Sequence, residues 1–328
     1  MKIFVFEYAT TLNAQNFIAE GKAMLNLIIR GLRKERIKVC TLSNNKQRNF
    51  LLLHEKILEN VRNSDNTILI APNYELLTIS SFLDHHNLFD KVLISPINAL
   101  NKTLNKFNLY EELNNKIIAM PKTIEFSNFY IGAIKFPIII KPIYGTGCGD
   151  TYVFKDSKSY GEFVKTGKQK FNENFIVQEF IDGIHISVCL FAGNCIYPVS
   201  LNRQHINFAR GKVSYDGGVV PFQANEQSRS KIFEYSKLVC AYLNLKGYIG
   251  MDFVIDDKNE KIYLIEINPR ITTSAIALSK ATNLNIAKLH IACFKDGEIL
   301  RKELSEVKFL NAVEILKYKN GMRCRIKK

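Results

Sequence analysis

Several features that mark other classes of protein are absent from this sequence of 328 residues. It has only 8 prolines, no Gly/Ser-rich linker, no low-complexity tract and no internal repeat. No apolar run approaches the roughly 20 residues that a membrane-spanning helix requires, so we expect no membrane association. The first residues, MKIFVFEYATTLN, lack a long apolar segment and a small-residue cleavage site, so we expect a β-strand there and no secretory signal. The composition is typical of a soluble globular protein with two or three packed lobes.

Cysteine pairs are absent as well. None of the seven cysteines (40, 148, 189, 195, 240, 293 and 324) forms a C-x-x-C pair, and an odd number is not typical of a disulfide framework. We therefore expect reduced, mostly buried thiols, a cytoplasmic protein and no thiolate metal site. The sequence also lacks the G-x-x-x-x-G-K-[ST] order of a P-loop, and it has no Ser/His/Asp or Cys/His arrangement for nucleophilic catalysis.

Acidic residues are outnumbered, since 45 Lys and Arg against 31 Asp and Glu give a net charge of +14. Such a charge could indicate a nucleic-acid partner. However, the lysines are spread along the chain, and the dense basic cluster RGLRKERIK at 30–38 continues an amphipathic helix. We interpret this cluster as the solvated end of a helix and do not expect nucleic acid to be a partner.

The first part of the chain alternates between strand-like and helix-like patterns. The expected strands are 3–6, 38–43, 66–73 and 91–95, and the expected helices are 14–35, 50–63 and 74–87. Strands that alternate with helices predict a small parallel α/β lobe over residues 1–98.

The pattern changes after this lobe. We expect a helix over 100–114 and, from 136 to 265, a series of strands in hairpin-like order. One further helix is expected over 228–244. The predicted fold class is therefore an α/β lobe joined to an α+β region.

The segment GMDFVIDDKNEKIYLIEINPR predicts a hairpin with its turn at DDKNE. Because side chains at i and i+2 face the same way along a strand, Glu266 and Asn268 share a face, and Asp252 lies within reach on the partner strand. Arg270 joins that face if the strand stays regular. Carboxylate and amide oxygens suit Mg²⁺ or Mn²⁺. The alternative is a solvated strand end, which the Asn-Pro turn favours.

A second polar segment is IIIKPIYGTGCGD, at 138–150. Lys141 ends an apolar strand, where its ammonium group could meet a phosphate at the mouth of a cleft. Gly145, Gly147 and Gly149 would let backbone N–H groups approach phosphate oxygens. An ordinary glycine-rich hairpin turn is the alternative interpretation.

A third segment is NFIVQEFIDGIHISV, at 174–188. Gln178 and Glu179 end an apolar strand just before a turn at Asp182 and Gly183. A carboxylate and exposed backbone at this point could contact the edge of an adenine ring. Taken alone, the segment favours the alternative, a strand end with only a structural role.

Taken in order, the lysine strand, the glycine-rich loop, the E-F-I-x-G turn, MDFV and IEINPR resemble the ATP-grasp superfamily over roughly 100–290. The resemblance implies an ATP-grasp fold in which two α+β subdomains, expected at 99–175 and 176–328, hold ATP between them. It also implies a ligase that forms an acyl phosphate from a carboxylate, after which an amine displaces phosphate to give an amide and ADP.

The resemblance also implies roles for individual residues. Lys106 and Lys141 match the two ATP lysines, with Lys102 competing for the first role. The remaining nucleotide contacts are the mobile loop Gly145, Thr146, Gly147 and Gly149, and the adenine and ribose residues Gln178, Glu179, Phe180, Ile181 and His185. Asp252, Glu266 and Asn268 match the three ligands for Mg²⁺ or Mn²⁺.

Two positions depart from the family pattern. His185 stands where many relatives have the glutamate that holds the ribose. Many amide ligases have an arginine just before the metal-binding aspartate, whereas this chain has GYIGMD. Arg203 or Arg270 must then contact the acyl phosphate, and Lys141 remains a further catalytic candidate.

A narrower resemblance rests on FEYAT, EGKAML, LNRQHI, YDGGVVPF and EINPRITTS. These segments are similar to an archaeal branch of the superfamily that joins the γ-carboxylate of glutamate to the amine of tyramine in methanofuran biosynthesis. Glu7, Glu20 or Asp216 could then face an ammonium group. The alternatives are an ATP-grasp ligase with another acid or amine, a nucleotide-binding regulator and, more remotely, a basic nucleic-acid-binding protein. The resemblance also allows for a homodimer.

Overall fold

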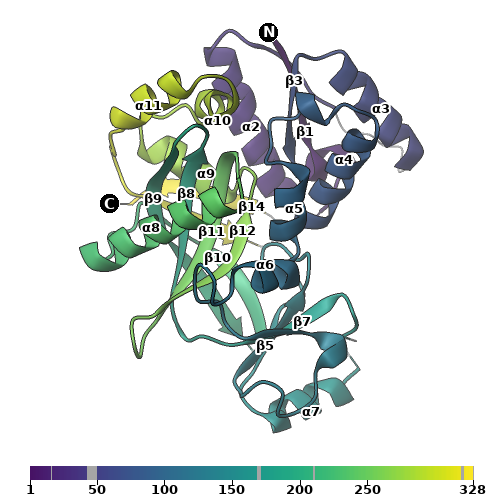
Figure 1. The fold of residues 1–328 in the computed structure, drawn as a ribbon, viewed down its shortest axis with the longest axis vertical. Helices are drawn as coiled ribbons and strands as arrows, with labels where there is room; N and C mark the ends of the chain where they lie inside the picture. Colours follow the sequence, from purple (N-terminus) through teal and green to yellow (C-terminus); the bar gives the residue numbers. More distant parts are fainter. Residues whose placement is uncertain (16, 43–49, 168–170, 210, 319–320, 328) are drawn as a thin grey trace.

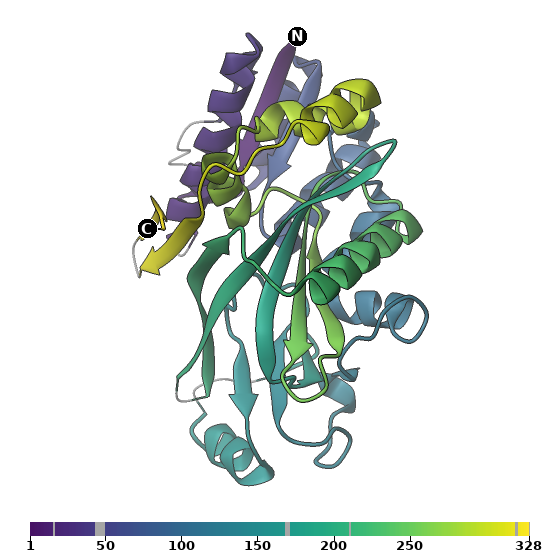
Figure 2. The ribbon, with the colours of Figure 1, turned by 90° about the vertical axis from the view of Figure 1, so that its left-hand side faces the viewer.

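The computed structural model describes residues 1–15, 17–42, 50–167, 171–209, 211–318 and 321–327. Their strands form a small parallel sheet near the N-terminus and a large antiparallel sheet. Figure 1 shows the N-terminal lobe at one end of the molecule and the helix α7 at the opposite end. The strands of the large sheet run between these ends, as the turned view in Figure 2 shows.

The N-terminal lobe is the predicted parallel α/β unit. Its strands have the order β2-β1-β3 and are all parallel. Their bounds are β1 Lys2–Glu7, β2 Lys38–Cys40 and β3 Asn66–Ile70, and the helices are α1 Tyr8–Leu12, α2 Ile18–Lys34, α3 Phe50–Arg62 and α4 Asn73–His85. Every residue of β3 is buried, as expected for a parallel strand covered on both faces.

Four predictions for this lobe need correction. The expected strand 66–73 ends at Ile70, because Pro72 precedes the start of α4 at Asn73. The expected strand 91–95 contributes only one bridge, between Thr67 and Val92, because the short 3-10 helix η1 (Phe89–Lys91) and Pro96 leave too few extended residues. The expected helix 14–35 begins only at Ile18. The expected strand 38–43 ends at Cys40, and its last residue lies outside the described residues.

The single helix expected over 100–114 is two helices, α5 (Ile97–Leu104) and α6 (Lys106–Leu113). Asn105 between them has an extended backbone, and its side chain accepts hydrogen bonds from the amides of Phe107 and Asn108, at 2.8 and 3.0 Å. Asparagine favours such a cap over the helix interior, which ends α5 and starts α6. The break makes Lys106 the first residue of α6.

The large sheet has the strand order β12-β11-β8-β9-β10-β6-β5-β7-β4, and β13 pairs with both β10 and β14. The strands are β4 Thr123–Glu125, β5 Ile138–Pro142, β6 Tyr152–Phe154, β7 Phe175–Glu179, β8 Gly183–Ala192, β9 Ile196–Ala209, β10 Lys212–Val220, β11 Gly247–Asp256, β12 Ile262–Asn268, β13 Val313–Tyr318 and β14 Gly321–Ile326. Its two parts are joined where β10 meets β6, through the pair Lys212 and Tyr152. A narrow junction of this kind separates two subdomains along one sheet.

The remaining helices are α7 Ser157–Lys165, α8 Glu226–Tyr242, α9 Thr273–Ala281, α10 Ile286–Lys295 and α11 Gly297–Ser305, with a 3-10 helix η2 at Phe126–Asn128. The sequence predicted α8 within two residues but did not predict α7, α9, α10, α11, β13 or β14. The segments LNRQ and YDGG, which carry part of the narrower resemblance, lie inside β9 and β10. Helix α2 packs against α9, α10 and β14, which attaches the N-terminal lobe to the large sheet.

The predicted division at 98 and 175 stays a prediction. Position 175 is the first residue of β7, which pairs with β4 and β5. None of the helices in the described ranges is long and apolar enough to cross a membrane. All seven cysteines carry free thiols, but only Cys189, Cys240 and Cys293 are buried, so the expectation of mostly buried thiols was too strong.

Candidate active site

A cavity of about 210 Å³ opens where the two parts of the large sheet face each other. Of the residues predicted from the sequence, it brings together Lys106, Lys141, Gly145, Thr146, Gly147, Gln178, Glu179, Phe180, Ile181, His185, Asp252, Glu266, Asn268 and Arg270. Gly149 and Arg203 do not line it. Residues from both sides of the sheet junction therefore contribute to one site.

Two carboxylates form the floor of the cavity. Asp252 on β11 lies directly opposite Glu266 on β12, as the predicted hairpin requires. The Asn268 amide nitrogen donates to both, at 3.3 Å to Asp252 and 3.1 Å to Glu266. Gln204, which the sequence did not identify, donates to the other oxygen of Asp252 at 3.0 Å. Gln204 follows Arg203 on β9 and lies in the segment LNRQHI, which the narrower resemblance had already marked.

Two lysines face these carboxylates. The ammonium nitrogen of Lys106 lies 3.2 Å from Glu266 and 2.6 Å from the carbonyl oxygen of Gly145. Lys141 is buried beside it, and burial together with the charge of Lys106 lowers the pKa of Lys141 to about 8. Lys102, the competing candidate, pairs with Glu112 at 2.9 Å outside the cavity. The geometry therefore favours Lys106.

The two carboxylates have opposite ionisation behaviour. Burial would raise the pKa of Glu266, but Lys106 and Lys141 outweigh it and lower the value to about 2. Burial and the charge of Glu266 raise the pKa of Asp252 well above its usual range. The two lysines thus compensate the charge of only one carboxylate. A further positive charge would be needed for Asp252 and Glu266 to be ionised together.

This cluster is a set of oxygen donors, and not of sulfur or imidazole. Within the described part of the chain no group of three His, Cys, Asp or Glu side chains is placed to hold a metal ion. The candidate set therefore consists of Asp252, Glu266 and the amide of Asn268. In this structure the amide nitrogen faces the carboxylates, and the amide oxygen accepts from Arg270 at 3.2 Å. A rotation of the amide would turn its oxygen towards the carboxylates.

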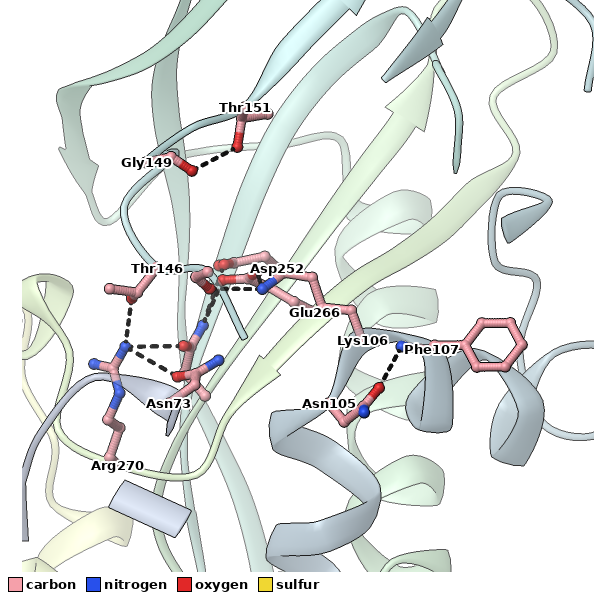
Figure 3. Close-up of polar contacts among 12 residues, drawn as sticks. Asn73, Asn105, Lys106, Phe107, Thr146, Gly149, Thr151, Asp252, Glu266 and Arg270 are labelled. Atoms are coloured by element: carbon pink, nitrogen blue, oxygen red, sulfur yellow. Dashed lines mark hydrogen bonds and ion pairs between the residues drawn. The ribbon is translucent and has the colours of Figure 1, made fainter. Parts of the chain in front are cut away.

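Arg270 reaches the cluster from the other side (Figure 3). Strand β12 ends at Asn268, yet the guanidinium returns to the site and donates to Thr146 at 2.8 Å and to Asn73 at 3.5 Å. Burial lowers the pKa of Arg270, while the charges of Glu266 and Asp252 oppose that change. Asn73, the first residue of α4, was missed because no motif in the N-terminal lobe marks it.

Arg203 lies elsewhere. Its side chain is exposed, and its guanidinium lies 5.6 Å from the centre of the Phe222 ring. Because Gln204 faces Asp252, its neighbour Arg203 must face the opposite side of β9. The placement gives no support to the catalytic role predicted for Arg203.

The glycine-rich segment covers the cavity as a turn between β5 and β6. Gly147 has a φ of 60°, which glycine adopts without strain, and Cys148 and Asp150 also have positive φ. Lys106 holds the Gly145 carbonyl, and Arg270 holds the Thr146 hydroxyl. Gly149 accepts from the Thr151 hydroxyl at 3.3 Å, so it supports the turn from outside the cavity (Figure 3).

The other end of the cavity is mostly apolar and aromatic. The rings of Phe180 and Phe208 are 5.3 Å apart, and the His185 ring is 5.9 Å from Phe208. Burial lowers the pKa of His185, which favours the neutral imidazole. Gln178 donates to Thr123 at 2.7 Å and is buried. Phe208, near the end of the long strand β9, was not predicted from the sequence.

Comparison with known proteins agrees with this geometry. A family model described as an ATP-grasp domain matches residues 103–274, more than half of the chain. This chain belongs to the ATP-grasp family. The matched range spans both parts of the large sheet and every residue of the charged floor of the cavity.

Named relatives extend this ATP-grasp assignment. The chain is 29% identical to the tyramine–L-glutamate ligase of Methanocaldococcus fervens over 92% of this chain and 96% of the relative. It is 43% identical to the tyramine–L-glutamate ligase of Methanocaldococcus jannaschii over 42% of this chain and 41% of the relative. A crystal structure of an ATP-grasp superfamily protein from Archaeoglobus fulgidus matches all of both chains with a TM-score of 0.74 and 22% identity.

These findings confirm the predicted ATP-grasp fold and the resemblance to the archaeal branch. They support the predicted class of ATP-dependent carboxylate–amine ligase and do not favour a nucleic-acid-binding protein.

Proposed function

We propose that this chain is an ATP-dependent ligase that joins the γ-carboxylate of L-glutamate to the amine of tyramine through an acyl phosphate. The observation that carries the reaction type is the floor of the cavity, where Asp252 and Glu266 face Lys106 and Lys141 beneath the glycine-rich turn. The names of the two archaeal relatives support the choice of substrates.

The carboxylate pair fits a divalent metal ion. Burial and the charge of Glu266 raise the pKa of Asp252, and a cation between the two carboxylates would relieve their repulsion. Asp252, Glu266 and, after rotation of its amide, Asn268 would hold Mg²⁺ or Mn²⁺. When bound, such an ion would neutralise charge on the phosphate oxygens of ATP.

The cationic side chains of this chain have complementary roles in the proposal. Lys106 and Lys141 contact the phosphates, so that negative charge on the transferring phosphoryl group meets preorganised positive charge. Arg270 contacts the acyl phosphate or the substrate carboxylate from the opposite side, where it now holds Thr146. The phosphoryl group passes from ATP to the carboxylate, and the amine then attacks the carbonyl carbon and releases phosphate.

The glycine-rich turn would shield this chemistry from water. An acyl phosphate hydrolyses readily, so the site must exclude water between the two steps. Lys106 and Arg270 hold Gly145 and Thr146 in this structure, and the binding of ATP would compete for both contacts. The aromatic end formed by Phe180, His185 and Phe208 would receive the adenosine.

A product assay tests the proposal. Purified protein is incubated with ATP, Mg²⁺ and pairs of acids and amines, and both ADP and the amide are measured, the amide by mass spectrometry. We expect equal amounts of ADP and γ-glutamyltyramine only when glutamate and tyramine are both present. Reaction with other pairs alone would reject the substrates and keep the ligase, and no amide from any pair would reject the ligase.

A further inference from the structure

An ion pair between the N-terminal lobe and the last hairpin lies beside the cavity. Glu20 on α2 lies 2.6 Å from Lys317 on β13, and their side chains are 15% and 23% exposed. Glu20 lines the cavity together with Tyr215 and Thr273. The Lys317 ammonium is 5.9 Å from the centre of the Tyr215 ring and 3.9 Å from the point where a Cβ on Gly147 would lie. The pair therefore sits beneath the glycine-rich turn.

Both residues of this pair lie outside the matched ATP-grasp domain at 103–274. Glu20 comes from the N-terminal lobe, and Lys317 comes from the last hairpin of the chain. The family match therefore accounts for the charged floor of the cavity but not for the ion pair beside it. Segments outside the shared domain are where features particular to this chain are expected.

Two other acidic residues that the sequence suggested for an ammonium group are not available. Glu7 is buried and accepts hydrogen bonds from the amides of Ala9 and Thr10, at 2.9 and 2.6 Å. Asp216 is exposed, does not line the cavity and accepts from Ser214 at 2.9 Å. Among the three, Glu20 alone faces the cavity.

The position of Arg270 shows which part of a substrate reaches this pair. The reacting carboxylate must lie near Arg270 and the charged floor, since the phosphates are placed there. Glu20 and Arg270 line the same cavity, together with Thr272 and Thr273. The groups of the acid that do not react must therefore extend towards Glu20 and Lys317.

We propose that Glu20 and Lys317 bind the α-ammonium and α-carboxylate groups of the amino-acid substrate. This inference rests on the proposed amino-acid ligase function. A zwitterion carries one charge of each sign, so it can separate the ion pair and compensate both side chains. An amine such as tyramine has no carboxylate and would leave Lys317 without a partner. The pair thus selects α-amino acids as the acid substrate.

Substrate analogues test this assignment. Glutarate is glutamate without its α-ammonium group, so it cannot pair with Glu20. We expect Glu20→Gln to lower kcat/KM for L-glutamate about 10- to 100-fold, the effect of losing one charge-assisted contact. The same variant should change kcat/KM for glutarate less than about threefold, which is below the effect of one such contact. In this variant, KM for ATP and KM for tyramine should also change less than about threefold from the wild-type values.

A matched variant controls for the loss of an ion pair as such. Lys288 and Glu303 are also 2.6 Å apart and join α10 to α11 away from the cavity. Glu303→Gln should therefore leave KM for L-glutamate unchanged. Equal losses with glutamate and glutarate in Glu20→Gln would overturn the proposal, because they would show that the pair only supports the fold.

Binding measurements separate this proposal from the proposed function. Calorimetry with ADP, Mg²⁺ and L-glutamate, using wild type and Glu20→Gln, needs no turnover. Weaker glutamate binding in the variant supports the subsite even if wild type makes no γ-glutamyltyramine. Equal binding by both proteins, or no glutamate binding by wild type, overturns it.

Discussion

Two polar clusters, whose members are buried or half-buried, meet at strand β11 and differ in charge. The charged cluster consists of Lys106, Lys141, Asp252, Glu266 and Asn268, and the neutral cluster consists of Cys189, Tyr248, Thr272 and His290. Tyr248 and Asp252 are four residues apart and lie on one face of the strand. Gly250 lies between them, where a Cβ would come within 2.8 Å of Thr272. The two clusters are thus neighbours on one scaffold.

The neutral cluster satisfies its own hydrogen bonds. The Tyr248 hydroxyl lies 2.9 Å from both the Cys189 sulfur and the Thr272 hydroxyl. The Tyr248 amide donates to Nδ1 of His290, so Nε2 carries the proton and donates to the carbonyl oxygen of Leu93, each at 3.0 Å. His290 therefore links α10, β11 and the N-terminal lobe.

The charged cluster does not compensate all of its own charges. Asp252 is driven towards protonation by burial and by Glu266, although Lys106 and Lys141 are nearby. A buried carboxylate without full compensation reduces stability, so its presence indicates a function. Burial alone therefore does not distinguish structural from functional polar groups. What distinguishes them is whether every buried polar group has a hydrogen-bond partner or a compensating charge.

The largest effect is expected from neutralising the charged cluster. Glu266→Gln and Asp252→Asn should each lower kcat at least about 100-fold, since binding of the metal and phosphates loses several kcal/mol. Both variants should stay folded. Asp252→Asn should be at least as stable as wild type without metal, because it removes an uncompensated carboxyl, whereas Glu266→Gln should be less stable, because it leaves Lys106 and Lys141 without their carboxylate partner. Turnover and urea unfolding measure both outcomes. Full activity in either variant would reject the metal assignment.

The two arginines provide the next test. Arg270→Ala should lower kcat/KM about 100-fold, as for loss of one preorganised donor to developing charge. Arg203→Ala should stay within about threefold of wild type, because exposed surface residues contribute little. Steady-state kinetics with ATP and both substrates measures the ratio. Equal losses in the two variants would contradict the placement of Arg203 outside the site.

The neutral cluster should respond to pH. Burial lowers the pKa of His290 to about 4, from the usual 6.5 of an exposed imidazole. Below pH 6.5 the unfolded chain binds a proton at this imidazole, whereas the imidazole of the folded chain stays neutral until about pH 4. The stability that depends on the neutral His290 is therefore fully present above pH 6.5 and is lost as the pH falls towards 4. Between pH 7.5 and 5 the loss should be about 2 kcal/mol.

The variant His290→Gln isolates that contribution. Gln cannot titrate, so the decrease in unfolding free energy between pH 7.5 and 5 should be about 2 kcal/mol smaller than in wild type. Urea unfolding at both pH values measures the difference, and other titrating groups cancel between the two proteins. The same decrease in wild type and variant would show that His290 is not the neutral link described.

The smallest effect is expected from Tyr248→Phe. This change removes the hydroxyl that contacts Cys189 and Thr272 and leaves the ring in place. The unfolding free energy should fall by about 1 kcal/mol, the usual contribution of one buried hydrogen bond. Activity should be unchanged, because the neutral cluster does not contact the phosphates. A loss of activity comparable to that of Glu266→Gln would erase the distinction between the clusters.

Local sequence patterns predicted much of the fold. Apolar runs and helical periodicity identified α3, α4, α8 and the strands that carry the motifs. They did not predict the break at Asn105, because a capping asparagine and a helix-interior asparagine look alike without the surrounding turns. They also missed the strand pairing of the last hairpin, because β13 finds its partner about a hundred residues earlier, in β10.

The site was predictable where one strand or hairpin fixes the geometry. The alternation of β12 and its pairing with β11 already placed Asp252, Glu266 and Asn268 together. The same reasoning could not choose between Arg203 and Arg270. The pairing of β9 with β8 decides which face of the sheet Arg203 occupies, and that face is turned away from the cavity. Asn73 and Lys317 needed the packing of separate lobes.

By itself, the sequence determined which chemical groups this protein has and which short segments hold them in order. The glycine-rich turn and the carboxylate hairpin are such local units, because hydrogen bonds between near neighbours in the chain fix them. Only the tertiary structure decided that Lys106, Arg270 and Glu20 meet around one cavity. They come from segments far apart in the chain, and their approach depends on burying the apolar faces of α2, α6 and the large sheet together, which no local pattern encodes.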